Sequence, residues 1–121
     1  MFIINCKNYN EISGEKINKL SSIVEKISKK YKIPIAIAPP HHQLASIRWT
    51  MTGRYLSKLL VFAQHLDDAK VGSTTGYMIP EIVKKSKVNG ALINHSEHRI
   101  SSKEITNLVK RLKKLKMKTV V

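Results

Sequence analysis

Four polar residues follow a short apolar run near the end of the chain. The run that starts at Gly90 has the apolar character of a strand, and Asn94, His95, Ser96 and Glu97 come directly after it. An imidazole, a hydroxyl and a carboxylate at one strand end could polarise a carbonyl and hold a cation. Ligand and catalytic groups of parallel α/β proteins concentrate at the carboxyl ends of strands. We therefore expect the chemistry of this protein at this strand end.

The first apolar run also ends in polar side chains, in the segment Ile4-Asn5-Cys6-Lys7. Because side chains alternate along a strand, Asn5 and Lys7 share one face. Cys6 points to the other face, where we expect a buried small hydrophobe. A lysine at the carboxyl end of a strand must reach water, a carboxylate or an anionic ligand. Glu97 is the carboxylate that we expect to pair with Lys7 and to hold its ammonium group in place.

His95 lies shortly before a predicted helix that Ser101 caps. The positive end of a helix dipole favours neutral imidazole, which can donate a hydrogen bond to a developing oxyanion. A lone histidine is usually structural, but here several polar groups share the strand end. We therefore interpret His95 as a candidate electrophile.

Two other polar segments give weaker signals. Residues 72–76, Gly-Ser-Thr-Thr-Gly, form a flexible loop that could bind phosphate, but they match no phosphate-loop motif, which favours a plain loop. His41 and His42 are neighbours, and neighbouring residues rarely converge on one metal ion. No matching Cys, His or Asp spacing occurs elsewhere in the sequence. We therefore expect no metal site.

Apolar runs spaced about 30 residues apart indicate strands that alternate with helices. The runs begin near Phe2, Ile33, Leu60, Gly90 and Thr119. Between the first two runs, an apolar stripe at helical spacing predicts a helix with Ser13 as its N-cap. This stripe consists of Ile17, Leu20, Val24, Ile27 and Tyr31.

The later helices carry clear start signals. Pro80 is typical of a first helical turn, and Ser101-Ser-Lys-Glu104 fits a capping box for the last helix. Gln43 to Ile47 could form a short helix, and residues 48–59 match no regular pattern. The expected apolar face of the last helix consists of Ile105, Leu108, Val109, Leu112 and Leu115.

Strands that alternate with helices imply an α/β fold whose parallel sheet has right-handed crossovers. About four strand–helix units and the start of a fifth strand make either a small open sheet or half of an eight-fold barrel, and periodicity leaves both open. The chain of 121 residues has room for one domain, with no separate second domain. No apolar run is long enough to span a membrane, no signal peptide is visible, and one cysteine excludes an internal disulfide. We therefore expect a cytoplasmic protein.

The chain is strongly basic, with 22 Lys and Arg against 8 acidic residues and a formal charge of +14. Such a charge would suit a nucleic-acid binder. Most of the excess is lysine, however, and the lysines fall mainly on the polar faces of predicted helices. Only Arg48, Arg54, Arg99 and Arg111 could make planar, bidentate contacts. The pattern favours a solvated surface and disfavours a nucleic-acid partner.

Taken together, these residues resemble the N-terminal half of a triosephosphate isomerase, most of all the short archaeal type. The matching segments are residues 4–7; Ala63-Gln64-His65 with Asp67; residues 72–76; and Asn94-His95-Ser96-Glu97 with Arg99. The resemblance implies a (β/α)₈ barrel of the TIM-barrel type, of which this chain covers half. It also implies an enzyme that interconverts dihydroxyacetone phosphate and glyceraldehyde 3-phosphate in glycolysis and gluconeogenesis, without a cofactor.

The resemblance also implies roles for individual residues. Asn5 and Lys7 would contact the phosphorylated triose, with Lys7 giving electrostatic stabilisation. His95 would be the neutral electrophile, and Glu97 would position Lys7. Asn94 and Ser96 would support the site, and Thr75 would reach into a neighbouring subunit's active site.

The chain departs from the family in three places. The family's general base is a glutamate near the sixth strand, so no catalytic base is present in these 121 residues. His98 replaces a residue that is usually arginine. Residues 48–59 do not resemble the helix end and turn expected there, and we interpret them as a local reading-frame slip.

We expect the isolated chain to be inactive, because half of the site is missing. One alternative is a non-catalytic half-barrel that self-associates or pairs with a complementary half, since a half-barrel exposes two edge strands. A less favoured alternative is a basic nucleic-acid-binding protein.

Overall fold

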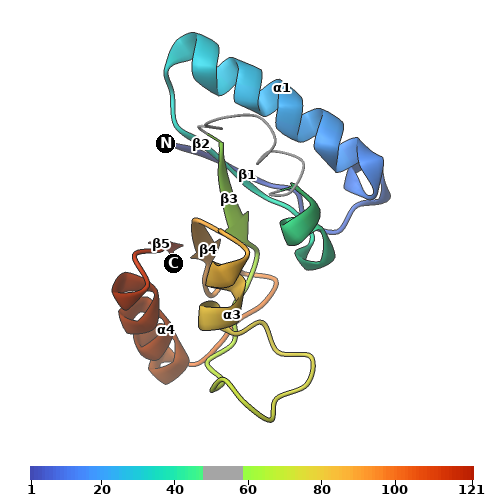
Figure 1. Ribbon diagram of the computed structural model, residues 1–121. Helices are drawn as coiled ribbons and strands as arrows, with labels where there is room; N and C mark the ends of the chain where they lie inside the picture. The colour runs from blue at the N-terminus through green and yellow to red at the C-terminus, as the bar shows by residue number, and fades with distance from the viewer. Residues whose placement is uncertain (48–58) are drawn as a thin grey trace.

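The computed structural model describes residues 1–47 and 59–121, and its centre is a parallel sheet with five strands in the order β1-β2-β3-β4-β5 (Figure 1). The irregular stretch in the sequence, residues 48–58, lies outside the described residues. Each strand pairs in parallel with the next one along the chain. The strands are β1 (Phe2–Asn5), β2 (Ile35–Ala38), β3 (Leu60–Ala63), β4 (Gly90–Leu92) and β5 (Lys118–Val120).

The helices connect successive strands, as the sequence predicts. They are the short 3₁₀ helices η1 (Asn10–Ile12) and η2 (His41–Gln43), and the α-helices α1 (Glu15–Tyr31), α3 (Pro80–Lys85) and α4 (Ser102–Lys114). Residues 44–47 continue helically after η2, which agrees with the short helix predicted there. Strand β2 starts two residues later than expected, at Ile35, because Pro34 has no N–H to give to a neighbouring strand.

Side chains alternate between two faces of the sheet. The outer face carries Ile37, Val61 and Ala91 into the main core beneath the helices. The inner face carries a second, smaller cluster around Phe62. A β-carbon on Gly90 would lie 2.8 Å from the Phe62 ring, so the absent side chain of Gly90 lets this ring fill the inner face. The inner cluster consists of Ala36, Ala38, Phe62 and Leu92.

The helix α1 is as predicted, but the expectation for its N-cap is wrong. Gly14, with φ of 63°, precedes the helix as its N-cap, and the Ser13 hydroxyl instead donates to the Tyr9 carbonyl oxygen at 3.2 Å. The serine is used to close the η1 turn, so it cannot cap α1. The apolar stripe that predicts this helix is only partly buried: Ile17 and Val24 are in the core, but Ile27 and Tyr31 are 44% and 59% exposed. The second half of α1 therefore presents apolar side chains outward in the part of the chain that is described.

The starts of the later helices, α3 and α4, are as predicted. Pro80 occupies the first turn of α3. At α4 the Ser101 hydroxyl accepts from the Glu104 N–H at 3.3 Å, and the Glu104 carboxylate accepts from the Ser101 N–H at 2.9 Å, which is a complete capping box. Leu108 and Leu112 of the predicted apolar face are fully buried.

An ion-pair cluster joins α4 to α3 and to the loop after β3. Arg111 donates to Glu81 at 2.6 Å and to Asp68 at 2.9 Å, and Asn107 donates to Asp68 at 2.7 Å. These contacts raise the pKa of Arg111 and lower the pKa of Glu81. The cluster fixes the start of the loop that leads toward the candidate site.

Cys6 is buried on the helix side, as expected, and burial raises the pKa of its thiol to about 11. No helix within residues 1–47 and 59–121 has both the length and the hydropathy needed to cross a bilayer.

Candidate functional site

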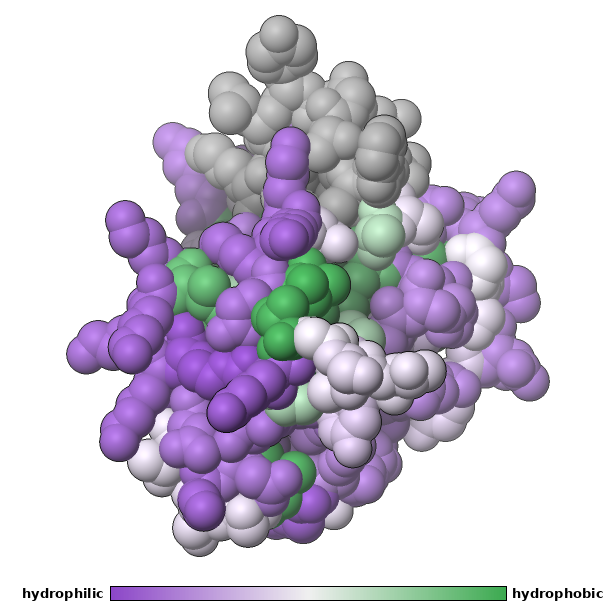
Figure 2. Space-filling model, turned by 60° about the horizontal axis from the view of Figure 1, so that its bottom comes forward, coloured by the Kyte–Doolittle hydropathy of each residue, from purple (hydrophilic) through white to green (hydrophobic). Residues whose placement is uncertain are grey.

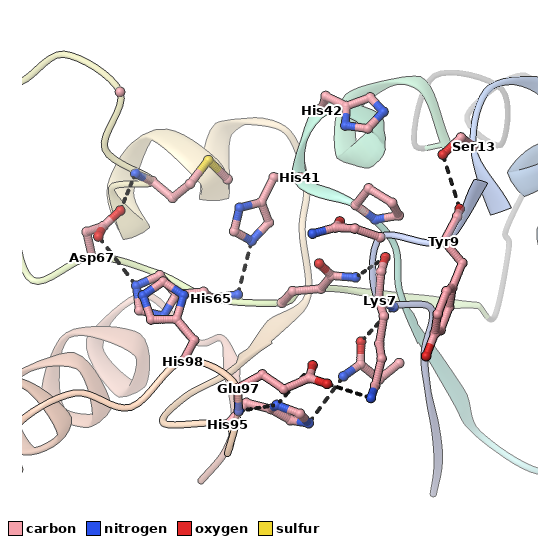
Figure 3. A pocket seen from close by; sticks show the side chains of 16 residues that line it. Lys7, Tyr9, Ser13, His41, His42, His65, Asp67, His95, Glu97 and His98 are labelled. Carbon is pink, nitrogen blue, oxygen red and sulfur yellow. Dashed lines mark hydrogen bonds and ion pairs between the residues drawn. The ribbon is translucent and has the colours of Figure 1, made fainter. Parts of the chain in front are cut away.

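A cavity of about 880 Å³ lies at the carboxyl ends of the strands (Figure 3). Its walls come from the segments that follow β1, β2, β3 and β4. Figure 2 is turned to bring the lower end of the view in Figure 1 forward, and it shows a mainly hydrophilic surface with small apolar patches. The principal polar lining residues are Asn5, Lys7, His41, Gln64, His65, Asp67, His95 and Glu97.

Lys7 and Glu97 form the ion pair that the sequence predicts. The Lys7 Nζ lies 2.7 Å from Glu97 Oε1, although the two residues are 90 positions apart (Figure 3). The hydrogen bond between them raises the pKa of Lys7 and lowers the pKa of Glu97. Both side chains are exposed, at 39% and 58%, so the pair contributes little to stability. Its effect is to hold the ammonium group at the cavity wall.

The backbone at Lys7 leaves the strand abruptly. Its φ is 49°, in the left-handed region, and its N–H donates to Asn5 Oδ1 at 3.0 Å. This local hydrogen bond stabilises a turn that a non-glycine residue seldom adopts. Asn5 and Lys7 consequently both line the cavity, whereas Cys6 between them is in the core.

A hydrogen bond from the backbone of Glu97 holds the His95 ring. Glu97 N–H donates to His95 Nδ1 at 3.2 Å, so in the neutral ring the proton is on Nε2. His95 Nε2 lies 3.5 Å from Asn5 Nδ2. In this tautomer both nitrogens are donors, and their contact is not a hydrogen bond. The Nε2 proton is then available to a ligand oxygen in the cavity.

Asn94 and Ser96 flank His95 but do not line the cavity. Asn94 has φ of 64°, and its Oδ1 accepts from the Ile100 N–H at 3.2 Å. Arg99 donates to the Asn94 carbonyl oxygen at 3.2 Å. Asn94 therefore shapes the turn that presents His95, whereas Ser96 is exposed.

Gln64 lines the cavity but is not among the site residues predicted from the sequence. Its Nε2 donates to the carbonyl oxygens of Lys7 at 2.9 Å and Ala38 at 3.1 Å. One side chain thus ties together the ends of β1, β2 and β3. The alternation of side chains along β3 could have indicated this residue, because Gln64 follows Phe62 by two positions and so shares the inner face of the sheet.

A histidine cluster forms the other wall of the cavity. His65 N–H donates to His41 Nε2 at 3.0 Å, and the rings of His65 and His98 stack with centroids 3.7 Å apart. Asp67 Oδ1 lies 3.4 Å from His65 Nε2. Burial lowers the pKa of both His41 and His65. No sequence spacing predicts this cluster, because its members come from three separate segments.

The loop after β3 is closed at its base by one residue pair. Asp67 N–H donates to the Met78 carbonyl oxygen at 3.0 Å, and Met78 N–H donates to Asp67 Oδ2 at 2.6 Å. Gly72 and Gly76 have positive φ, and Thr75 between them is exposed. Thr75 does not line the cavity, in contrast to Gly76.

Among the described residues, no three His, Cys, Asp or Glu side chains are grouped so that they could hold a metal ion. The donors of the site are an ammonium group, an amide and an imidazole. Such groups bind an anionic or carbonyl-bearing small molecule.

The fold and the cavity define a class: a partial α/β barrel with a polar site at the carboxyl ends of its parallel strands. Comparison of the sequence with protein-family models identifies the family. The family model described as triosephosphate isomerase matches residues 1–121, and the chain belongs to this family.

Named relatives agree with the family model. The chain is 47% identical over 121 residues to a triosephosphate isomerase of Cenarchaeum symbiosum, and 37% identical to one of Saccharolobus solfataricus. All of this chain is covered in both cases, but only 51% of each relative. The chain therefore spans about half the length of these curated relatives.

A solved structure gives the fold independently. The crystal structure of triosephosphate isomerase from Bartonella henselae matches with a TM-score of 0.79, at 20% sequence identity. It covers 98% of this chain, whereas this chain covers 48% of it. Of the two architectures left open by periodicity, the half-barrel is therefore confirmed.

Proposed function

We propose that this chain carries the electrophilic half of a triosephosphate isomerase site, for the interconversion of dihydroxyacetone phosphate and glyceraldehyde 3-phosphate. The observation that carries the proposal is the convergence of Asn5, Lys7, His95 and Glu97 on one cavity wall. These residues come from two strand ends 90 positions apart, and the Lys7–Glu97 ion pair joins the two ends.

In this proposal Lys7 supplies positive charge to the phosphorylated triose. The pKa of its ammonium group is raised by Glu97, so the group stays charged throughout the neutral range. Asn5 fixes the turn at Lys7 and presents its own amide NH₂ to the same cavity. Glu97 acts by positioning Lys7.

His95 is the proposed electrophile. The tautomer set by the Glu97 N–H places a proton on Nε2, from which it can be donated to a substrate carbonyl oxygen. Triosephosphate isomerases are the established example of a neutral histidine in this role. As a base removes a proton from the neighbouring carbon, His95 gives its Nε2 proton to the carbonyl oxygen and takes one back from the adjacent hydroxyl. The base then returns its proton to the former carbonyl carbon, which completes the isomerisation.

The general base is proposed to come from outside these 121 residues. Asp67 and Glu97 are the carboxylates that line the described cavity, and both are engaged. Glu97 pairs with Lys7, and Asp67 accepts from the Met78 N–H. The isolated chain is therefore proposed to be inactive.

The partners and the location follow from the same proposal. The exposed loop that carries Thr75 would insert into the cavity of a neighbouring subunit, and no cofactor is required. We place the protein in the cytoplasm, where glycolysis and gluconeogenesis operate.

Complementation tests the proposal. The chain is mixed with, or fused to, the C-terminal half of the Cenarchaeum symbiosum relative, and turnover of glyceraldehyde 3-phosphate is measured. The 121-residue chain alone is expected to show no turnover, and the complemented form to show it. His95→Gln in the complemented form should lower kcat by about 100-fold or more, the usual loss for one oxyanion donor.

The control is Lys103→Gln, on the exposed face of α4 and outside the cavity lining. This variant should keep the activity of the complemented form. Turnover by the isolated chain that depends on His95 contradicts the half-site proposal. Full activity of the complemented His95→Gln form contradicts the role of His95.

A further inference from the structure

The charges of this chain are separated between the two ends of the half-barrel. Its acidic residues, with the exception of Glu25, lie in η1, in the first turns of helices or in segments that follow strands, and so at the carboxyl end of the sheet. They are Glu11, Glu15, Asp67, Asp68, Glu81, Glu97 and Glu104. The opposite end, where the strands begin, is left without negative charge apart from Glu25.

Lysines gather at that opposite end. They occupy the last turns of α1, α3 and α4 and the short connections into β2, β4 and β5. We call this set the basal surface: Lys30, Lys32, Lys84, Lys85, Lys87, Lys113, Lys114, Lys116 and Lys118. All of them are exposed except Lys84, which is half-buried.

The connections have an unusual backbone feature in common. Lys32, Lys87 and Lys116 each follow a helix and each have φ between 54° and 58°. Glycine or asparagine is the usual residue at such a left-handed helix end. Lysine in all three places costs some conformational energy, and it adds a positive charge to the basal surface each time.

The connections also lie next to one another. Lys118 N–H donates to the Asn89 carbonyl oxygen at 2.8 Å, which joins the first residue of β5 to the residue before β4. Phe62, Gly90 and Lys118 are in register across three strands. With strands about 4.8 Å apart, the basal edge of the sheet is on the order of 20 Å long, a little over half a duplex turn of about 34 Å.

These lysines have few internal partners. In the described part of the chain, the ion pair at this end joins Lys29 to Glu25 at 2.8 Å. No ion pair within residues 1–47 and 59–121 involves a member of the basal surface. Helix dipoles favour one or two cations at each helix end, but they do not require charge in the connections as well.

We propose that the basal surface binds the phosphodiester backbone of a nucleic acid duplex. From composition alone a solvated surface is favoured, and the spatial separation of the charges changes that interpretation. Lysine ammonium groups are point charges that suit phosphates, and the basal surface, as defined from the described residues, contains no arginine to read bases. The binding is therefore independent of base sequence, and it is independent of the proposed isomerase site at the other end.

The experiment measures binding of the 121-residue chain to labelled DNA and RNA duplexes of about 20 base pairs by fluorescence anisotropy. Salt is varied between about 50 and 200 mM, because counterion release makes log K fall linearly with log salt. The test variant is Lys87→Gln with Lys116→Gln and Lys118→Gln. The matched control is Lys16→Gln with Lys19→Gln and Lys103→Gln, which removes the same charge from the starts of α1 and α4.

The chain should bind both duplexes with a dissociation constant in the micromolar range at about 50 mM salt. The test variant should lose about tenfold or more in affinity, and its salt slope should fall by about three, one for each phosphate contact removed. The control should keep the slope. Circular dichroism is used to verify that both variants fold.

Several results would overturn the proposal. The first is an absence of salt-dependent binding to either duplex. The second is an equal loss of affinity in the test variant and in the control. The third is that a poly-glutamate peptide, at the same concentration of negative charge, displaces the labelled duplex as well as an unlabelled duplex does. A preference above tenfold for DNA or for RNA would also contradict recognition through backbone charge alone.

Discussion

His65 lies where three segments of the chain meet. His41 from η2 accepts its backbone N–H, the His98 ring from the β4–α4 connection stacks on it, and Asp67 contacts it from its own loop. Glu104 at the start of α4 adds negative charge at longer range. Burial and the His98 ring lower the pKa of His65, and this outweighs the effect of the two carboxylates.

A pH dependence of stability follows at this residue. The folded state binds the His65 proton more weakly than the unfolded chain, whose imidazole has the ordinary pKa of 6.5. The contribution of His65 is therefore fully present above about pH 6.5 and is lost as pH falls through the folded-state pKa. Between about pH 7 and 5, the free energy of unfolding of the His65→Asn variant should fall less steeply than that of the wild type. Urea titrations at several pH values measure this difference.

The matched control is His42→Asn. His42 neighbours His41 but is exposed, so this variant should keep the contribution of His65 to the pH dependence. The half-buried His41, whose pKa is also lowered, chiefly by burial, contributes in the same direction and is present in both variants. A His65→Asn chain that loses stability in acid as steeply as the wild type would contradict the assignment to His65.

At the scale of elements, the strands and most helix starts could be predicted from sequence. Pro80 and the Ser101–Glu104 capping box are local signals, and local signals act within one turn. The prediction for Ser13 is wrong because its hydroxyl could either cap α1 or close the η1 turn. A local rule does not show which of these two hydrogen bonds forms. The Gln64 anchor and the His65–His98 stack depend on how separate strands align, which spacing along the chain does not reveal.

The capping box allows a direct test at this scale. Ser101→Ala removes the acceptor for the Glu104 N–H and should lower the free energy of unfolding by about 1 kcal/mol. Ser102→Ala, one position inside the helix and without a capping contact, should change it by less than about 0.5 kcal/mol. Urea unfolding followed by circular dichroism measures both. Equal stability of the two variants would show that the cap does not hold α4 in place.

At the scale of the whole molecule, both edges of the sheet are unpaired among the described residues. In the described residues β1 pairs only with β2, and β5 pairs only with β4. Exposed apolar side chains lie on β1 and on the helix that follows it: Phe2 is 65% exposed, and Ile27 and Tyr31 on α1 are 44% and 59% exposed. Unpaired edge strands next to apolar surface favour pairing with another chain.

We therefore expect the chain to self-associate, with the β1 edge of one copy against the β5 edge of another. Sedimentation velocity at micromolar concentration should show dimers or larger species. Phe2→Lys with Ile27→Lys should weaken association by about tenfold or more, because burying such side chains is worth about 1.5–3 kcal/mol each and lysine protects an edge. Ile82→Lys on α3, with an equally exposed isoleucine at 45%, is the control and should leave association unchanged. A folded monomer at these concentrations would rule out this edge-to-edge contact.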